Sequence, residues 1–210
     1  MSTSAGTVYI VDDDISVRES LADLVSTAGW EAQCFAAARD FLACLRSQGP
    51  SCLVLDIGLP DLNGLDLQDR VAGESEGMPI IFITGYGDVP MSVRAMKAGA
   101  VEFLVKPLNG DALLLAIASA IERSRAFARE SHELQALRAR YETLSGRERQ
   151  VMAMVVSGLL NKQVGGKLGI SEITVKAHRG RVMGKMMAVS FADLVMMNAR
   201  LGLTSQPVDR

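Results

Sequence analysis

Four short apolar runs, each followed at once by a polar or charged residue, constrain the fold of this chain more than any other feature. The runs are VYIV (8–11), CLVL (52–55), IIFI (80–83) and EFLV (102–105), and a weaker run, WEAQCF, covers 30–35. Helical patterns separate them. Runs that are apolar on both faces and alternate with helices are typical of a parallel sheet covered on both sides. We therefore expect an α/β, doubly wound, five-stranded parallel sheet within residues 1–122.

The residues that follow the runs carry chemical groups to one edge of this sheet. Asp12 and Asp13 follow the first run, Asp56 the second, Thr84 the third and Lys106 the fourth. Because the carboxyl ends of parallel strands meet at the same edge, these side chains are expected to converge. A single aspartate after a strand is more often a helix cap or a turn former, but four such endings in register favour a functional site.

The chemistry of this edge points to phosphoryl transfer. Carboxylates at Asp12, Asp13 and Asp56 repel one another unless a cation lies between them. Mg²⁺ suits such a cluster, because it is held by one or two carboxylates together with waters and phosphate oxygens. Lys106 and Thr84 are suited to bind the oxygens of a transferred phosphoryl group. Asp56 stands alone in the middle of the strand order and is the candidate nucleophile.

These motifs resemble a known family. IVDDD, LVLDIGLPDLNG, FITGYGD and AMKAGAVEFLVKP are similar to the receiver-domain signature of two-component response regulators over residues 7 to 122. The resemblance implies a flavodoxin/CheY-like fold in which Asp56 accepts a phosphoryl group from a sensor histidine kinase. It also implies that Mg²⁺ is bound by Asp12, Asp13, Asp56 and the backbone carbonyl of Gly58.

The resemblance further implies a conformational switch beside the phosphoryl site. Thr84 and Lys106 would bind the phosphoryl group, and Phe103, three residues before the lysine, would move inward together with Thr84. An aromatic residue on a terminal strand is more often simply part of the packing, so this role of Phe103 depends on the resemblance. The Lys106–Pro107 peptide bond is expected to be cis, as in other receiver domains.

The net charge of −2 hides two parts of opposite sign. Residues 1–122 contain 7 Lys and Arg against 17 Asp and Glu, whereas residues 123–210 contain 15 against 7. The resulting net charges are −10 and +8. Such asymmetry indicates an acidic module joined to a basic one, and the basic one is a candidate for contact with phosphates.

Other classes of protein are disfavoured by composition. Cys34, Cys44 and Cys52 are an odd number without CxxC spacing, and two histidines accompany them, so neither a disulfide framework nor a zinc site is supported. The longest apolar stretch, 112–121, is about half of what a membrane span needs. The N-terminus lacks the features of a secretion signal. A cytoplasmic protein without membrane contact is expected.

Residues 123–138 are interpreted as a helical linker. The helical pattern runs from Ala112 to Leu144 without Gly or Pro, and Leu134, Leu137, Tyr141 and Leu144 are spaced as in a heptad pattern over about two heptads. Two interpretations remain open. The stripe is either a dimer seam or a narrow apolar face that docks on its own neighbouring domain.

Residues 139–210 are expected to form an all-α, four-helix helix-turn-helix domain. Ser145 and Glu148 have the spacing of a capping box at a helix start. A second short helix covers 161–168 and ends at Gly169, and Ser171 caps a basic third helix. Two short helices joined by a glycine-containing turn, the second of them basic, are typical of a helix-turn-helix whose second helix enters the major groove.

The C-terminal motifs LSGRERQVM, GLLNKQVGGKLGISEITVKAHRGRVMGKM and SFADLV resemble the LuxR-type domain of NarL/FixJ regulators, and the FixJ-like branch in particular. The resemblance implies a helix-turn-helix over 161–180 and dimerisation through a last helix near 190–201. Gly165 departs from the family, which usually has Ala there. The residues expected to contact DNA are Thr174, Val175, Lys176, His178, Arg179 and Arg181.

The sequence therefore predicts a transcription factor rather than an enzyme. Phosphorylation of Asp56 would switch dimerisation and sequence-specific binding to double-stranded promoter DNA, with RNA polymerase as a further candidate partner. One alternative is a receiver that acts as a phosphorylation-independent interaction module on a DNA-binding protein. A phosphatase or phosphotransferase with an aspartyl intermediate is disfavoured, because Gly58 stands where such enzymes usually have a second acidic group.

Overall fold

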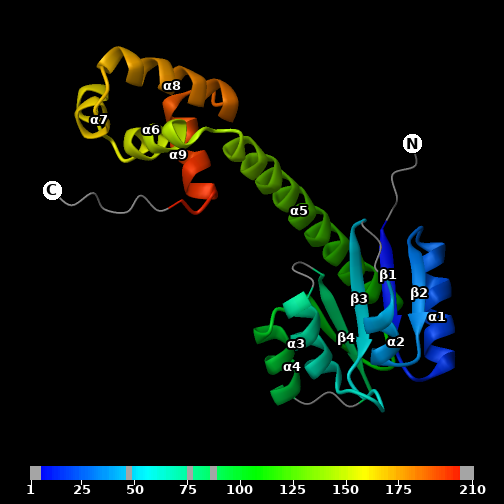
Figure 1. Ribbon diagram of the computed structural model, residues 1–210. Helices are drawn as coiled ribbons and strands as arrows, with labels where there is room; N and C mark the ends of the chain where they lie inside the picture. Colours follow the sequence, from blue (N-terminus) through cyan, green and yellow to red (C-terminus); the bar gives the residue numbers. More distant parts are fainter. Residues whose placement is uncertain (1–5, 46–48, 75–77, 86–88, 204–210) are drawn as a thin grey trace. The chain divides into compact units, whose positions relative to one another are not determined.

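The computed structural model describes residues 6–45, 49–74, 78–85 and 89–203, which form two compact units that divide after Arg129. The first unit contains a five-stranded, fully parallel sheet in the order β2-β1-β3-β4-β5 (Figure 1), which confirms the prediction. This order is the flavodoxin-like arrangement. The strands are β1 (Thr7–Val11), β2 (Glu31–Phe35), β3 (Ser51–Asp56), β4 (Ile80–Thr84) and β5 (Glu102–Val105).

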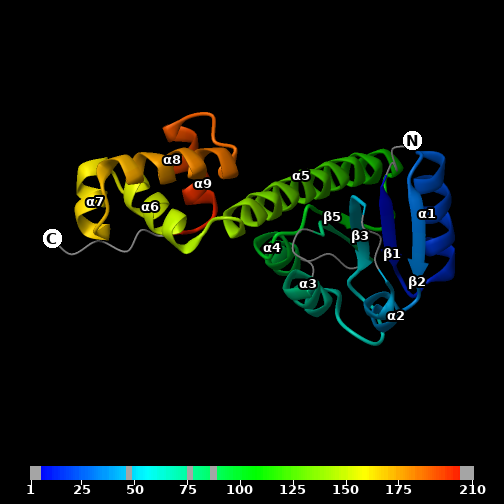
Figure 2. The same ribbon diagram turned by 45° about the horizontal axis from the view of Figure 1, so that its top comes forward.

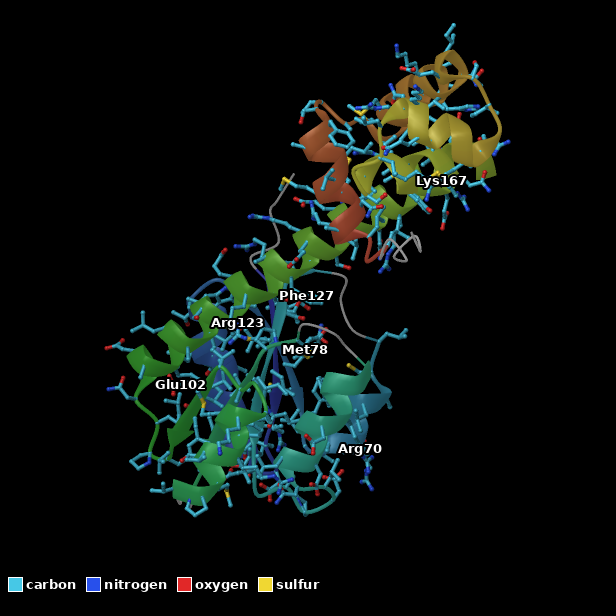
Figure 3. All side chains as sticks on the ribbon, turned by 90° about the vertical axis from the view of Figure 1, so that its left-hand side faces the viewer. Arg70, Met78, Glu102, Arg123, Phe127 and Lys167 are labelled. Carbon is cyan, nitrogen blue, oxygen red and sulfur yellow. The ribbon has the colours of Figure 1, made fainter. Side chains whose placement is uncertain are left out.

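Helices cover both faces of the sheet (Figures 1 and 2), and side chains fill the space between the sheet and these helices (Figure 3). Alternate residues of β1 show why, since Val8 and Ile10 pack against α1 and α5, whereas Tyr9 and Val11 pack on the opposite side with α2, α3 and α4. The central strands β1, β3 and β4 are buried along their whole length, and the edge strands β2 and β5 are partly exposed. The helices are α1 (Ile15–Thr27), α2 (Ala38–Ala43), α3 (Gly64–Glu74), α4 (Val89–Lys97) and α5 (Gly110–Glu142).

The second unit is a small helical domain with its own core. It contains α6 (Gly146–Val156), α7 (Asn161–Leu168), α8 (Glu172–Met186) and α9 (Phe191–Arg200). Val151, Val164, Val182 and Leu194, one from each helix, are fully buried in this core. The predicted all-α helix-turn-helix domain is therefore confirmed.

The C-terminal end of α5 belongs to this second core. Leu137 and Leu144 are buried in it and Tyr141 packs against it, so the apolar stripe docks on its own domain. Glu133 also forms an ion pair with Arg200 of α9. The compact unit accordingly begins at Glu130, upstream of the expected boundary at residue 139, because the stripe supplies core side chains before that point.

The residues predicted to start and end helices in this domain do so. Ser145 and Glu148 form the reciprocal capping box at the start of α6, and Ser171 caps α8 through the backbone amide of Thr174. Gly169 ends α7 in the left-handed conformation, with φ 66°. These three helix ends are thus fixed by local hydrogen bonds.

Gly165 lies where α7 approaches the turn into α8. A Cβ atom at this position would stand 2.7 Å from the backbone oxygen of Ile170, whereas a Cβ on the neighbouring Gly166 would meet nothing within 4 Å. The departure from alanine at position 165 therefore permits a close approach of two backbone segments.

Within the described residues, no single helix is both long and apolar enough to cross a membrane. The bent pair α8 and α9 meets that test of length and composition only when its two helices are taken together.

Candidate functional site

Three groups from three strand ends meet at the carboxyl edge of the sheet. Asp12 follows β1, Asp56 ends β3 and Lys106 follows β5. The Lys106 Nζ atom lies 2.6 Å from Asp12 Oδ2 and 2.9 Å from Asp56 Oδ1. Both carboxylates are buried, and the lysine side chain is 24% exposed. The convergence expected from the sequence is therefore observed, with an ammonium group between the two acids.

The pKa values of this cluster reflect burial and charge together. Burial raises the pKa of Asp12, and hydrogen bonds from Lys106 and from the Asp14 amide oppose that rise only in part. Burial by itself would lower the pKa of Lys106, but its hydrogen bonds to Asp12 and Asp56 outweigh this effect and raise it. The lysine is thus held in its charged form.

Backbone contacts fix both carboxylates in place. Asp56 Oδ2 accepts a hydrogen bond from the Gly58 amide at 2.7 Å, and Asp12 Oδ1 accepts one from the Asp14 amide at 2.9 Å. Arg18 of α1 donates from one Nη1 atom to the backbone oxygens of Asp12 and Asp13, at 2.7 and 2.9 Å. Sequence reasoning missed Arg18, although a basic residue in the first turns of the helix after three aspartates was a usable signal.

Two other residues expected at the site lie on the neighbouring strands β4 and β5. Thr84 ends β4 and is buried. Phe103 lies in register with Phe82 and packs, half-buried, against the core on the α2, α3 and α4 side of the sheet. The Lys106–Pro107 peptide bond is cis. Residues 86–88 of the expected FITGYGD motif lie outside the described residues.

The donor set of Asp12 and Asp56 fits Mg²⁺. Among the described residues, no group of three or more His, Cys, Asp or Glu side chains is placed to hold a metal ion. Asp13 is exposed, whereas Asp12 and Asp56 both face the Lys106 ammonium. Mg²⁺ is commonly held by one or two carboxylates and several waters, so Asp12 and Asp56 are sufficient protein side chains for it.

The second site is the exposed face of α8. Thr174, Lys176 and Arg181 are exposed there, as expected of residues that contact DNA. The prediction for Val175 is wrong, because its side chain is 0% exposed and lies in the domain core. Val182 and Met186 lie seven and eleven residues further along the helix and are buried on the same stripe, a spacing that could have revealed the inner face.

His178 and Arg179 occupy the border between the two faces of α8. Both are half-buried, and His178 Nδ1 is buried with no hydrogen-bond partner among the described residues. The Arg179 Nη1 atom donates to Asn161 Oδ1 at 3.0 Å. Its guanidinium also lies over the ring of Phe191, 4.9 Å from the ring centre. The structure therefore engages Arg179 inside the domain.

A charged network joins α6 to α8. Glu148 Oε2 lies 2.7 Å from Lys185 Nζ, which also donates to the backbone oxygen of Thr143. The hydrogen bond from Lys185 and that from the Ser145 amide lower the pKa of Glu148 to about 2. Sequence reasoning identified Glu148 as part of a capping box but missed its ion pair with Lys185.

Comparison with known proteins identifies both domains. The family model described as "Response regulator receiver domain" matches residues 8–118, and the model described as "Bacterial regulatory proteins, luxR family" matches residues 142–198. The chain is a response regulator of the NarL/FixJ type. It therefore combines a receiver domain with a LuxR-type DNA-binding domain.

Full-length relatives of this response regulator share the same organisation. Nodulation protein W of Bradyrhizobium diazoefficiens is 48% identical over 97% of this chain and 89% of its own length. The transcriptional regulatory protein FixJ of the same organism is 40% identical over 96% and 98%. The solved structure of response regulator StyR matches with a TM-score of 0.81 and 44% identity, covering 93% of this chain and 98% of its own. FixJ and StyR are named as regulators, and the chain is a transcriptional response regulator.

Proposed function

We propose that Asp56 is the phosphoryl acceptor of this response regulator and that a sensor histidine kinase is the donor. The observation that carries the proposal is the placement of the Asp56 carboxylate at the end of a central strand, with Lys106 at one oxygen and the Gly58 amide at the other. In the transfer, an Asp56 oxygen forms a bond to phosphorus while the phosphorus–nitrogen bond of the donor histidine breaks.

The surrounding residues orient and neutralise the group that Asp56 receives. Asp12 and Asp56 would hold Mg²⁺, with Asp13 and the Gly58 carbonyl as further proposed ligands. Mg²⁺, when bound, offsets the negative charge on the phosphoryl oxygens. Lys106 is already within ion-pair distance of the acceptor oxygen, so it can follow the charge onto the phosphoryl group with little movement.

Phosphorylation is proposed to act on the rest of the protein through Thr84 and Phe103. Thr84 ends the strand next to Asp56, and Phe103 lies beside Phe82 on the neighbouring strand. A hydroxyl that turns toward the new phosphoryl oxygens would vacate space beside β4, and the half-buried ring of Phe103 could fill it. Such a repacking changes the surface of the receiver from a local charge event.

The proposed output is a homodimer bound to promoter DNA, with RNA polymerase as a further partner. The proposed location is the cytoplasm, where the protein can meet both the sensor kinase and DNA. Thr174, Lys176 and Arg181 are proposed to face the DNA because they are exposed on α8. Helix α9 is proposed as the dimer face, since Val195 and Met196 are 37% and 66% exposed on it. In this scheme the protein is a switch without catalytic turnover on external substrates.

The test compares Asp56→Asn with the matched variant Asp66→Asn, which changes an exposed carboxylate on α3. Both are incubated with acetyl phosphate and Mg²⁺, and the gain of one phosphoryl group is followed by intact mass. We expect labelling of wild type and Asp66→Asn and none of Asp56→Asn. Labelling of Asp56→Asn would refute the assignment of the acceptor.

A second measurement addresses the output. Binding to a DNA site selected from a random library is compared for phosphorylated and unphosphorylated wild type. We expect tighter binding after phosphorylation. Equal affinity in both states would favour the alternative that the receiver is a phosphorylation-independent interaction module.

A further inference from the structure

We propose that Arg179 is a positioning residue that fixes the recognition helix α8 against α7 and α9, and that it does not contact DNA phosphates. The proposal rests on the DNA-binding function of the domain and assigns a different role to one of the residues expected to contact DNA. It concerns residues 130–210 alone, which form one compact unit.

Arg179 joins the first residues of two other helices. Its Nη1 atom donates to the side chain of Asn161, the first residue of α7, at 3.0 Å. Its guanidinium also stacks over Phe191, the first residue of α9, at 4.9 Å from the ring centre. A single side chain of α8 therefore contacts the start of the preceding helix of the motif and the start of the last helix.

The position of Arg179 on α8 agrees with an inward role. Val175 and Val182, four residues before and three after it, are fully buried, so Arg179 lies at the edge of the inner face. Arg181 is two residues further along, which places it about 200° away around the helix axis. Arg181 is exposed, whereas Arg179 is half-buried. The two arginines therefore point to opposite sides of the helix.

Electrostatics explains why the guanidinium is held by these particular groups. The starts of α7 and α9 carry partial positive charge, which disfavours a nearby cation. The Asn161 oxygen and the face of the Phe191 ring both present partial negative charge to Arg179, and they offset that cost. A move outward to a phosphate would break both contacts at once.

The consequence concerns the spacing of two recognition helices on DNA. In a dimer of helix-turn-helix domains, the distance between the two recognition helices must match the distance between the half-sites. Because α9 carries the proposed dimer face, the contact between Arg179 and Phe191 connects that face to α8. Loss of Arg179 is therefore expected to reduce recognition of the correct two-part site, and to leave contact with phosphates unchanged.

The test compares Arg179→Met with the matched variant Arg181→Met in the full chain, on a selected two-part DNA site and on random DNA, across a range of salt concentrations. Methionine keeps a long aliphatic side chain and removes the charge in both variants. For Arg181→Met, we expect the slope of log affinity against log salt to fall by about one, as for the loss of one phosphate contact. For Arg179→Met, we expect an unchanged slope, an affinity about tenfold lower for the selected site, and unchanged affinity for random DNA.

Two additional variants make the result decisive. Lysine at position 179 keeps the charge but lacks the planar surface that stacks on Phe191, so Arg179→Lys is expected to bind the selected site as weakly as Arg179→Met. Phe191→Leu is expected to be non-additive with Arg179→Met, because both remove the same contact. A slope that falls by about one in Arg179→Met, or full affinity in Arg179→Lys, would overturn the proposal.

The outcomes separate this proposal from the underlying function. Wild type that selects no DNA sequence would contradict the DNA-binding function itself. If Arg179→Met loses its folded helical signal, Arg179→Lys and Phe191→Leu carry the comparison. Preserved affinity for the selected site in both of these variants would likewise overturn the positioning role.

Discussion

Replacing Glu148 by glutamine isolates the charge of the buried network that links α6 to α8. The Glu148 side chain is 5% exposed, and its Oε2 atom accepts from the Ser145 amide at 2.8 Å and from Lys185 at 2.7 Å. Glutamine has nearly the same shape and can still accept the backbone hydrogen bond. The variant therefore removes the ion pair and retains most of the packing and both hydrogen bonds of the capping box.

The magnitude follows from the shift in pKa. The pKa of Glu148 falls from an ordinary 4.5 to about 2, and each pKa unit corresponds to about 1.4 kcal/mol, which gives about 3 kcal/mol. Because the Lys185 side chain is 39% exposed, water screens part of this interaction, and we expect a loss of about 2 kcal/mol in the free energy of unfolding of the C-terminal unit.

The direction of the pKa shift determines how the stability of this unit changes with pH. The pKa is lower in the folded than in the unfolded state, so the stabilisation is fully present above pH 4.5 and is lost as the pH falls toward 2. The difference between wild type and Glu148→Gln should therefore shrink by about half between about pH 7 and about pH 3.5.

Hydrogen exchange of peptides from α6, α7 and α8, measured in the full chain at increasing urea concentration, reports the stability of this unit separately from the receiver. Ser145→Ala is the control, because it removes the neutral half of the capping box and should cost about 1 kcal/mol at every pH. The reasoning is refuted if the loss in Glu148→Gln is the same at both pH values, or if it is below about 0.5 kcal/mol at about pH 7.

Four further substitutions test contacts within the two domains. Gly165→Ala forces a Cβ against the Ile170 oxygen and should lower the free energy of unfolding of the C-terminal unit by about 1–3 kcal/mol. Gly166→Ala places its Cβ in open space and should raise the free energy of unfolding by up to about 1 kcal/mol. Equal effects of the two variants would contradict the close approach at Gly165. Lys106→Met leaves two neighbouring carboxylates without their cation, so the receiver should melt at a lower temperature. Addition of Mg²⁺ should raise this melting temperature again. A melting temperature that Mg²⁺ does not change would count against the two-carboxylate metal site. Ser124→Ala removes the acceptor of a buried backbone amide, and a cost of about 1–3 kcal/mol in urea unfolding of the receiver is expected.

The edge of the sheet was predictable because it depends on topology. Once the runs before Asp12, Asp56 and Lys106 are identified as parallel strands, their following residues must meet at the carboxyl edge, whatever their separation in sequence. The detailed contacts were not predictable. Whether Lys106 pairs with one carboxylate or lies between two depends on side-chain geometry, which no spacing in the sequence determines.

The face of the recognition helix was predicted less well. A cap and a run of basic residues located α8 correctly. The assignment of Val175 to the DNA side was wrong because it followed the family resemblance and did not take the helical repeat into account. The interval from Val175 to Val182 and Met186 follows the helical repeat and indicates the buried face. Arg179 has no comparable signal, since its partners Asn161 and Phe191 come from other helices.

Helix α5 limits where this regulator can be divided or fused. Its first half contributes Ile117 and Ile121 to the core of the receiver, and its last turns contribute Leu137 and Tyr141 to the core of the DNA-binding domain. A chimaeric regulator joined between residues 125 and 129 would leave each unit with its own buried side chains, including Ser124 in the receiver. A junction at residue 139 would instead remove Leu137 from the transplanted DNA-binding domain. The junction in a domain exchange within this family therefore has to be chosen according to which core each side chain of this continuous helix belongs to.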